Sequence, residues 1–415
     1  MSIISVFSGS FCNEKEVLHS VTEQTGYRLI ADSDLIAQAS RASGMSKEKI
    51  GRAFTAQPSV FNKFTHERER AIAYLRLVIA QTLSEDQLVI SGFSSHLIPR
   101  DISHVLHICL IADLKSRLAK AMETLKGSEP EATKLLHKQD EDRSAWVKQL
   151  RDSTDPWAPD LYDMVLPTDK METSEIAQKI KENAVSDVVR KNSRSQAAVS
   201  NFMLAAEVEI ALVKEGHQVI VSVRDGAVTL TINKHVLMLS RLENELKSIA
   251  GKVKNVRSVT TKVGPGFYQA DIYRKQDFAM PSKILLVDDE REFVQTLSER
   301  LLMRDMGSAV AYDGESALEV VREDEPDVMI LDLKMPGIDG IEVLRRVKES
   351  QPEIEVIILT GHGSAADRET CLQLGAFAYL QKPVDVEELS ATIKRANEKI
   401  QLKHKASGES TNSAS

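Results

Sequence analysis

Short apolar runs alternate with helix-like stretches along the last third of the chain. From about residue 282 to residue 400 the order strand then helix repeats five times, with short loops and Gly or Pro between the elements. Four of the apolar runs are 284–287, 328–331, 356–359 and 376–380. Because strands joined through helices pair in parallel, this pattern predicts a five-stranded doubly wound, flavodoxin-like sheet with helices on both faces.

A longer segment, residues 1–192, shows the same kind of alternation less regularly. It opens with an apolar strand at 3–7 and a helix at 14–25, and later buried runs at 87–90 and 105–111 alternate with helices. Alternating strands and helices are typical of layered α/β folds. The chain is therefore expected to begin with a second α/β domain.

A polar, unpatterned stretch at residues 192–197 predicts a linker to a small middle segment, residues 199–273. Within that segment, a helix is followed by a β-hairpin signal at Asp225 and Gly226, a second helix and a final strand. This order predicts a small α+β module. The low-complexity end of the chain, residues 401–415, predicts a disordered tail.

Composition limits the classes of protein that remain. At 415 residues the chain is long enough for several domains, and 42% apolar residues suffice for packed cores. A net charge of −8 argues against broad binding to nucleic acid, and no apolar run reaches the roughly 20 residues of a membrane span. Cys12, Cys109 and Cys371 are widely spaced and are expected to be reduced thiols in a cytoplasmic protein without a leader peptide.

Acidic residues follow two of the predicted strands in the last segment. Asp288 and Asp289 come directly after its first strand, and Asp332 comes after its third. The carboxyl ends of parallel strands converge on one crevice, where three acids cannot all stay ionised without a cation. Carboxylates, together with the backbone carbonyl of Lys334, are oxygen ligands that suit Mg²⁺. The sequence therefore predicts a magnesium site with an open side.

Polar residues that follow the later strands add the groups needed for phosphoryl transfer. A carboxylate such as Asp332 can attack phosphorus and form an acyl phosphate, and the developing charge needs a metal and a fixed cation. Lys382 can supply that cation, and the Thr360 hydroxyl can bond a phosphoryl oxygen. We therefore expect a phosphoryl group to be handled beside Asp332.

Separated runs of this last segment resemble the receiver domain of bacterial two-component response regulators. They are ILLVDDE (284–290), DLKMPGIDG (332–340), ILTGHG (358–363) and YLQKP (379–383). The resemblance implies that Asp332 is the phospho-acceptor, that Thr360 and Lys382 sense the phosphoryl group, and that Tyr379 rotates with them. It also implies a cis peptide bond between Lys382 and Pro383, bound Mg²⁺, and a sensor histidine kinase as partner.

The turn between the first strand and first helix of the chain occupies the place of a phosphate-binding loop. Gly9 and Lys15 match the outer positions of the pattern GxxxxGK[ST], but Glu14 replaces its second glycine and Glu16 its hydroxyl residue. Carboxylates beside a helix N-terminus repel an anion. We therefore interpret this turn as an ordinary helix start with an acidic first turn.

Other runs of residues 1–182 resemble the cytidylate-kinase-like family of nucleoside monophosphate kinases. They are TGYRLIADSDLI (25–36), LVISGF (88–93), HICLIADLKSRLAKAM (107–122), KQDEDRSAW (138–146) and DLYDMVLPTD (160–169). The resemblance implies a P-loop-kinase-like fold with Arg117 and Arg143 as lid or phosphate-binding arginines; alternatively, both are exposed helix residues. Because Phe93 replaces an arginine usual in that family and the glycine-rich loop is lost, we expect a degenerate scaffold with lost or weakened nucleotide binding.

The middle segment resembles a BON-type module in two runs. They are GHQVIVSVRDGAVTLT (216–231) and IAGKVKNVRSV (249–259). Such modules are associated with binding membranes or partners. The segment lacks an aromatic patch for membrane contact, so no stable membrane insertion is expected, and internal docking or a homodimer remains an equal alternative.

Two functions of different classes follow from these residues. The favoured one is phosphorelay signal transduction, in which phosphorylation of Asp332 changes how the other domains bind an unknown protein partner, without a classical enzyme activity beyond the receiver's own chemistry. The alternative is a receiver-regulated, cytidylate-type nucleoside monophosphate kinase. A transcriptional regulator is disfavoured because no helix-turn-helix or basic recognition helix follows the receiver.

Overall fold

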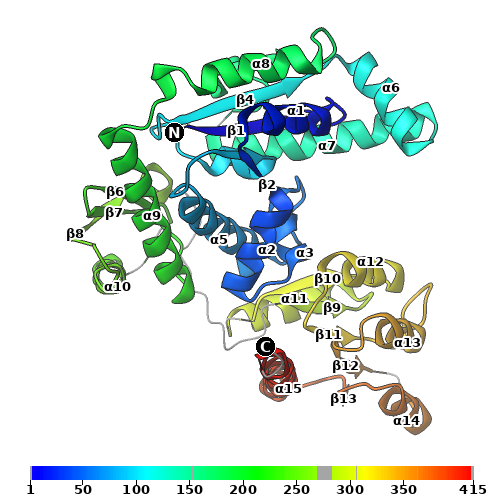
Figure 1. The fold of residues 1–415 in the computed structure, drawn as a ribbon. Helices are drawn as coiled ribbons and strands as arrows, with labels where there is room; N and C mark the ends of the chain where they lie inside the picture. Colours follow the sequence, from blue (N-terminus) through cyan, green and yellow to red (C-terminus); the bar gives the residue numbers. More distant parts are fainter. Residues whose placement is uncertain are drawn as a thin grey trace. The chain divides into compact units, whose positions relative to one another are not determined.

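The computed structural model describes residues 2–412 apart from 152, 235, 237, 269–282, 305 and 362. The chain divides into two compact units (Figure 1). One unit consists of residues 1–58 and 67–275, and the other consists of residues 59–66 and 276–415. Each unit contains a five-stranded parallel sheet with its own hydrophobic core.

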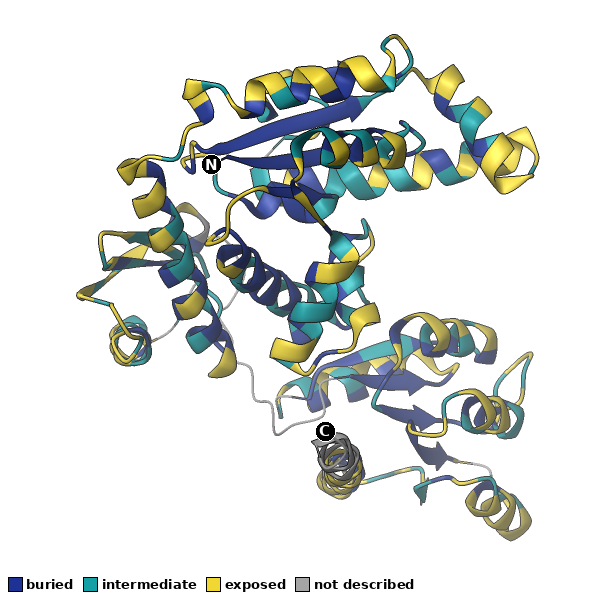
Figure 2. Cartoon of the chain, in the orientation of Figure 1, coloured by how far each residue is buried: buried dark blue, intermediate teal, exposed yellow. Residues whose placement is uncertain are grey.

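The sheet of the first unit has the strand order β2-β3-β1-β4-β5. Its strands are β1 (Ile3–Ser8), β2 (Arg28–Ala31), β3 (Leu88–Ser91), β4 (Val105–Ile111) and β5 (Met164–Pro167). Every residue of the central strand β1 is buried, as the dark blue arrows in Figure 2 show. Central strands of a parallel sheet are covered on both faces, so they consist of continuous apolar runs.

Helices cover both faces of this sheet. On one face, α1 (Glu14–Thr25) and α8 (Thr173–Ala184) share a core with Ile4, whereas Ile3 lies in the core on the other face, because successive strand residues point to opposite sides. The second face is covered by α2 (Asp32–Ser43), α5 (Glu67–Thr82) and α7 (Glu129–Arg151). The unit also contains α3 (Lys47–Gly51), η1 (Arg52–Phe54), η2 (Phe93–Leu97), α6 (Leu114–Leu125), η3 (Pro159–Leu161) and η4 (Asp187–Val189).

The residues expected to form a separate middle module belong to this first unit. They form α9 (Ser193–Lys214), β6 (Ile220–Arg224), β7 (Ala227–Ile232), α10 (Leu239–Ala250), β8 (Ser258–Val263) and η5 (Pro265–Tyr268). The three strands pair in the order β6-β7-β8, antiparallel at the hairpin and parallel between β7 and β8. The hairpin turns at Asp225 and Gly226, whose φ angles of 50° and 82° are those that a type I′ turn requires.

The polar stretch at residues 192–197 is not a linker, and that prediction is wrong. Asn192 accepts a hydrogen bond from Ser195 N over 2.9 Å, and Ser195 Oγ accepts one from Asn192 N over 3.1 Å. These reciprocal bonds satisfy backbone groups at the start of α9. The polar residues therefore begin a helix, a role that composition alone does not distinguish from a loop.

Helix α9 packs on two sides. Its Ile210 and Val213 lie in the core with α5, whereas Val208 and Leu212 lie in the core of the three-stranded sheet. Among the described residues, α9 is the one helix long and apolar enough to cross a membrane. A helix that is buried on two sides needs apolar residues on most of its surface, so packing inside the unit accounts for this composition.

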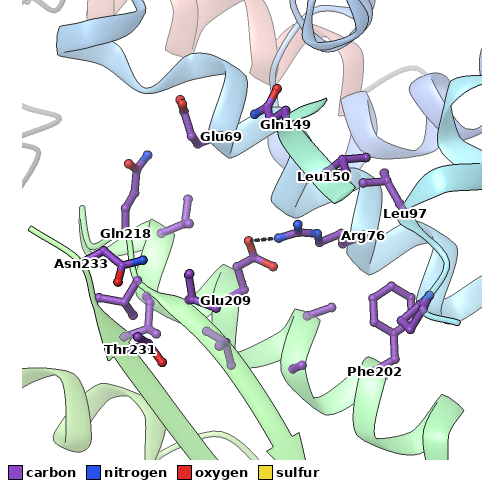
Figure 3. A pocket seen from close by; sticks show the side chains of 18 of the residues that line it. Glu69, Arg76, Leu97, Gln149, Leu150, Phe202, Glu209, Gln218, Thr231 and Asn233 are labelled. Atoms are coloured by element: carbon purple, nitrogen blue, oxygen red, sulfur yellow. Dashed lines mark hydrogen bonds and ion pairs between the residues drawn. The ribbon is translucent and has the colours of Figure 1, made fainter. Parts of the chain in front are cut away.

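A cavity of about 590 Å³ lies in the first unit between α5, α9 and the β6–β7 hairpin (Figure 3). Arg76 of α5 and Glu209 of α9 point toward one another across it and form an ion pair of 2.9 Å. The apolar side chains of Leu97 and Phe202 also line this cavity. The ion pair thus links the α/β layer to the middle module.

The second unit has the strand order β10-β9-β11-β12-β13, and every neighbouring pair is parallel. This is the predicted flavodoxin-like order, with the second strand at the edge beside the first. Its strands are β9 (Ile284–Val287), β10 (Ser308–Ala311), β11 (Val328–Leu331), β12 (Glu355–Thr360) and β13 (Ala378–Gln381).

Helices of the second unit divide between the two faces of its sheet. α11 (Arg291–Leu302) and α15 (Val386–Asn412) share a core with Ile284 and Leu286. The other face is covered by α12 (Gly314–Asp324), α13 (Gly340–Ser350) and α14 (Ala365–Gln373). The fold predicted from the strand–helix alternation is therefore confirmed.

Two segments of this unit differ from the sequence interpretation. Residues 59–66, with the short helix α4 (Asn62–Thr65), were expected in the first domain but belong to the second unit, where the Phe61 ring is fully buried in the core. Residues 401–415 were expected to be a disordered tail, yet residues 401–412 continue α15; residues 413–415 lie outside the described part of the chain. The helix extends because the residues before them already form it, so propagation adds turns without a new nucleation step.

Candidate functional site

The carboxyl ends of β9 and β11 bring three aspartates together. Asp288 and Asp289 directly follow β9, Asp332 directly follows β11, and Asp332 N donates a hydrogen bond to Val287 O over 2.9 Å. One carboxylate oxygen from each aspartate lies within 4.8 Å of those of the other two. Asp288 and Asp332 are buried, whereas Asp289 is exposed and leaves the site open to solvent.

The Asp332 carboxylate is held by one of its oxygens. Its Oδ2 accepts a hydrogen bond from Lys334 N over 3.2 Å, and its Oδ1 is buried without a hydrogen-bond partner among the described residues. Buried carboxylate oxygens are normally hydrogen-bonded or bound to a cation. Asp332 Oδ1 is therefore the oxygen of this side chain that is best placed to accept a phosphoryl group.

Lys382 supplies the cation of the site. Its Nζ lies 2.6 Å from Asp288 Oδ2, 3.3 Å from Glu290 Oε1 and 4.0 Å from Asp332 Oδ1. It also lies 4.4 Å from the centre of the Phe293 ring, which favours a positive charge. The sequence interpretation named Lys382 but missed Glu290 and Phe293 as its partners, although Glu290 stands directly beside the two aspartates.

The pKa shifts of Asp288 and Lys382 have different main causes. Burial raises the pKa of Asp288, and the hydrogen bond from Lys382 only partly opposes this shift. Burial lowers the pKa of Lys382, but the hydrogen bond and charge of Asp288, with the charge of Asp332, outweigh burial and raise it overall. Burial thus disfavours the charged form of Asp288, while the neighbouring acids favour the charged form of Lys382.

Oxygen donors with an open side fit Mg²⁺, because this ion prefers oxygen ligands and keeps several waters. Asp288, Asp289 and Asp332 can hold it, because one carboxylate oxygen of each lies within 4.8 Å of those of the other two. The backbone carbonyl of Lys334 remains a predicted ligand. Bound there, the ion would neutralise charge on a phosphoryl group beside Asp332.

Thr360 and Tyr379 lie on neighbouring strands of the same sheet. Thr360 ends β12 and is fully buried, and Lys382 N donates to its carbonyl over 2.9 Å. Within the part of the chain that the structure describes, the buried Tyr379 hydroxyl has no hydrogen-bond partner, and a side chain at Gly363 would overlap it. The peptide bond between Lys382 and Pro383 is cis, as predicted. Rotation of Tyr379 remains a prediction.

The three residues named as candidates for nucleotide binding in the first unit have different surroundings. Arg143 donates to the backbone carbonyl of Ser8 at the end of β1, and Arg117 donates to that of Ser10 in the loop after it. Lys15 is exposed in the first turn of α1. The alternative that both arginines are exposed is wrong, because Arg117 is buried and paired with Asp140 and Arg143 is half-buried. Sequence reasoning did not identify Asp140 as a partner.

Comparisons with known proteins agree with this geometry. A model of the response regulator receiver domain matches residues 284–394, and a model of the cytidylate kinase-like family matches residues 3–170. Response regulator MprA of Mycolicibacterium vanbaalenii is 36% identical over 115 residues, which are 28% of this chain and 50% of that protein. The chain thus spans about half the length of the curated relatives it matches.

Solved structures include similar receiver domains. A response regulator receiver domain protein from Clostridium thermocellum is 36% identical, with 29% of this chain and 97% of that chain covered and a TM-score of 0.28. A response regulator protein from Burkholderia pseudomallei, solved with a phosphorylated aspartic acid and a calcium ion, is 26% identical, with 29% and 71% covered and a TM-score of 0.27. Residues 284–394 of this chain are a response regulator receiver domain, and residues 3–170 match the cytidylate kinase-like family.

Proposed function

We propose that this protein acts in phosphorelay signal transduction and that Asp332 accepts a phosphoryl group from a sensor histidine kinase. The observation that carries this proposal is the buried Oδ1 of Asp332, which accepts no hydrogen bond from the described residues and lies 4.0 Å from the Lys382 ammonium. The receiver-domain match supports it, because receiver domains take a phosphoryl group from a donor. Asp332 would be the nucleophile, and Mg²⁺ held by the aspartates would offset the charge of the phosphoryl group.

The residues around Asp332 have distinct roles in this transfer. Asp332 Oδ1 forms the new O–P bond while the P–N bond to the donor histidine breaks, and the donor imidazole keeps the released electron pair. Lys382 lies close enough to shift from Asp288 toward the phosphoryl oxygens, whose charge it would balance. The Thr360 hydroxyl would donate to another phosphoryl oxygen.

The response to phosphorylation would spread from this crevice to β13 and α14. New negative charge on Asp332 would draw Thr360 and Lys382 inward, and the Tyr379 ring, whose hydroxyl bonds to none of the described residues, would follow. This would change the surface that α14 and β13 offer to a protein partner. The kinase-like and middle segments are the output whose interactions change, either with that partner or in a homodimer.

Mass spectrometry of the intact protein tests the first step. Incubation with Mg²⁺ and acetyl phosphate should add one phosphoryl group, and Asp332→Asn should abolish the addition. Asp339→Asn is the matched control, because exposed Asp339 caps α13 and asparagine caps helices equally well. Labelling that persists in Asp332→Asn and requires the native fold would show that another residue accepts the phosphoryl group.

A further inference from the structure

Charged side chains also gather at the loop that follows β1, in the kinase-like part of the chain. They are Glu14, Arg117 and Arg143. A nucleotide kinase with a phosphate loop needs close backbone amides and free cations at this position, since these groups hold the phosphates. In this structure the two arginines near the loop are bound to other parts of the same chain, and a carboxylate stands in the first turn of the helix that follows. The residues therefore do not fit a nucleoside phosphate as the family match would imply.

The loop itself carries bulky residues and an acid. Phe11 and Asn13 have left-handed backbones with φ of 60° and 51°, a conformation that glycine adopts without steric cost. α1 begins directly after Asn13, and Glu14 in its first turn accepts a hydrogen bond from Ser8 Oγ over 2.7 Å. A carboxylate is therefore fixed at the helix end that would otherwise attract a phosphate.

The two arginines near this loop are already bound. Arg117 donates to both carboxylate oxygens of Asp140, over 3.0 and 2.6 Å, and its Nε donates to Ser10 O over 2.8 Å. Arg143 donates to Ser8 O over 2.7 Å and to Gln139 O over 2.9 Å. A bidentate arginine–carboxylate pair has the geometry of an arginine–phosphate pair, so Asp140 takes the place of a phosphate on Arg117.

A third carboxylate binds the backbone amides that follow β3. Asp32 accepts hydrogen bonds from Phe93 N over 2.7 Å and from Ser94 N over 3.0 Å. Phe93, which stands where the family has an arginine, lies 5.2 Å below the Arg143 guanidinium. At the end of β3, a phenyl ring therefore replaces the cation that would bind a phosphate, and the backbone amides there are hydrogen-bonded to Asp32.

We propose that Glu14, Asp32 and Asp140 are internal substitutes for the phosphates of a nucleotide and that the kinase-like domain does not bind nucleoside phosphates. A bound phosphate would lie against Glu14 and Asp140 in a partly buried place, where like charges repel more strongly than in water. The family match then describes the fold of this domain and not its chemistry. These residues are separate from the receiver site, so the inference stands independently of Asp332.

Calorimetric titration of the intact chain with Mg²⁺-ATP, and separately with CMP, tests this proposal. The wild type should show no saturable binding up to about 1 mM nucleotide. The double variant Glu14→Gly/Asp140→Ala restores a loop glycine and frees Arg117, so it should bind Mg²⁺-ATP at least about tenfold more tightly, with a Kd below about 100 µM. Glu141→Ala is the matched control, because Glu141 is exposed on the same helix as Asp140.

A glycine in the first turn of α1 lowers helix stability, so Asp140→Asn is measured beside the double variant. Asp140→Asn removes the negative charge that faces the Arg117 guanidinium and hardly changes the shape of the side chain. This single variant should also gain Mg²⁺-ATP binding. The proposal is overturned if the wild type binds either nucleotide with a Kd below about 100 µM. It is equally overturned if Asp140→Asn keeps the wild-type circular dichroism and melting temperature but gains no binding.

Discussion

Replacing Lys382 with alanine removes the one ammonium group that the described structure places among the acids of the receiver site. Its Nζ lies 4.0 Å from Asp332 Oδ1, and a charge pair at that distance is worth about 1 kcal/mol in water and about 4 kcal/mol at an effective dielectric constant of 20. The Lys382 side chain is only 12% exposed and Asp332 is buried, so the value belongs in the upper part of this range.

The expected effects on phosphorylation and on metal binding have opposite signs. A loss of roughly 3–4 kcal/mol in the transition state corresponds to a rate of phosphoryl transfer to Asp332 that is lower by a factor of roughly 10²–10³. The affinity for Mg²⁺ should rise instead, by about tenfold, because the Lys382 ammonium 2.6 Å from Asp288 no longer competes with the ion.

The assay combines initial rates of labelling from acetyl phosphate at saturating Mg²⁺ with calorimetric titration of Mg²⁺ alone. Lys334→Ala is the control, since its side chain is exposed and the substitution keeps the backbone carbonyl and the amide that donates to Asp332. A rate for Lys382→Ala that stays close to wild type, or a Mg²⁺ affinity that falls, would falsify the role assigned to this lysine.

Two further predictions concern the stability of the first unit. Burial, with the charges of Arg151 and Arg100, lowers the pKa of His96 and His107 to about 3, so below pH 6.5 protons bind the unfolded chain more than the folded one. Well below pH 6.5 each histidine should lower the unfolding free energy by about 1.4 kcal/mol per pH unit, and the two together should lower it by about 3 kcal/mol between pH 6.5 and 5. Urea unfolding at several pH values measures this slope, which should halve in His107→Gln. An unchanged slope would contradict the assignment. Arg76→Ala should lower the unfolding free energy by about 1 kcal/mol, because Glu209, 2.9 Å away and largely buried, loses its partner. A double-mutant cycle with Glu209→Gln measures the coupling energy of the pair. A coupling energy of zero would show that the ion pair does not stabilise the contact between α5 and α9.

Much of the receiver fold and of its site was predictable from local pattern. Asp288 and Asp332 follow short apolar runs, and strand–helix alternation makes those runs parallel neighbours, so both carboxylates reach one crevice without any further information. Lys382 and Thr360 follow from the same rule applied to β12 and β13. Their partners Glu290 and Phe293 needed the structure, because side-chain direction in a loop or first helical turn is set by what packs around it.

Predictions failed where a polar stretch had more than one possible role. The residues from 192 to 197 have the composition of a linker and of a helix cap, and the position of α9 against two cores decides between the two. Residues 401–412 failed for a related reason, because their composition is that of a disordered chain but they continue a helix whose earlier turns are packed.

Periodicity and strand ends are local properties of a chain. The order of the elements, the parallel sheets that follow from it, and the acids and lysine of the receiver site could therefore be read from the amino acids alone. Three features could not: Phe61 is buried in the second unit, α9 packs in two cores, and Arg117 is bound by Asp140. These pairings join residues far apart in the chain, and they depend on how helices pack against a sheet. An apolar stripe specifies which side of a helix is buried, but not which distant residue it meets.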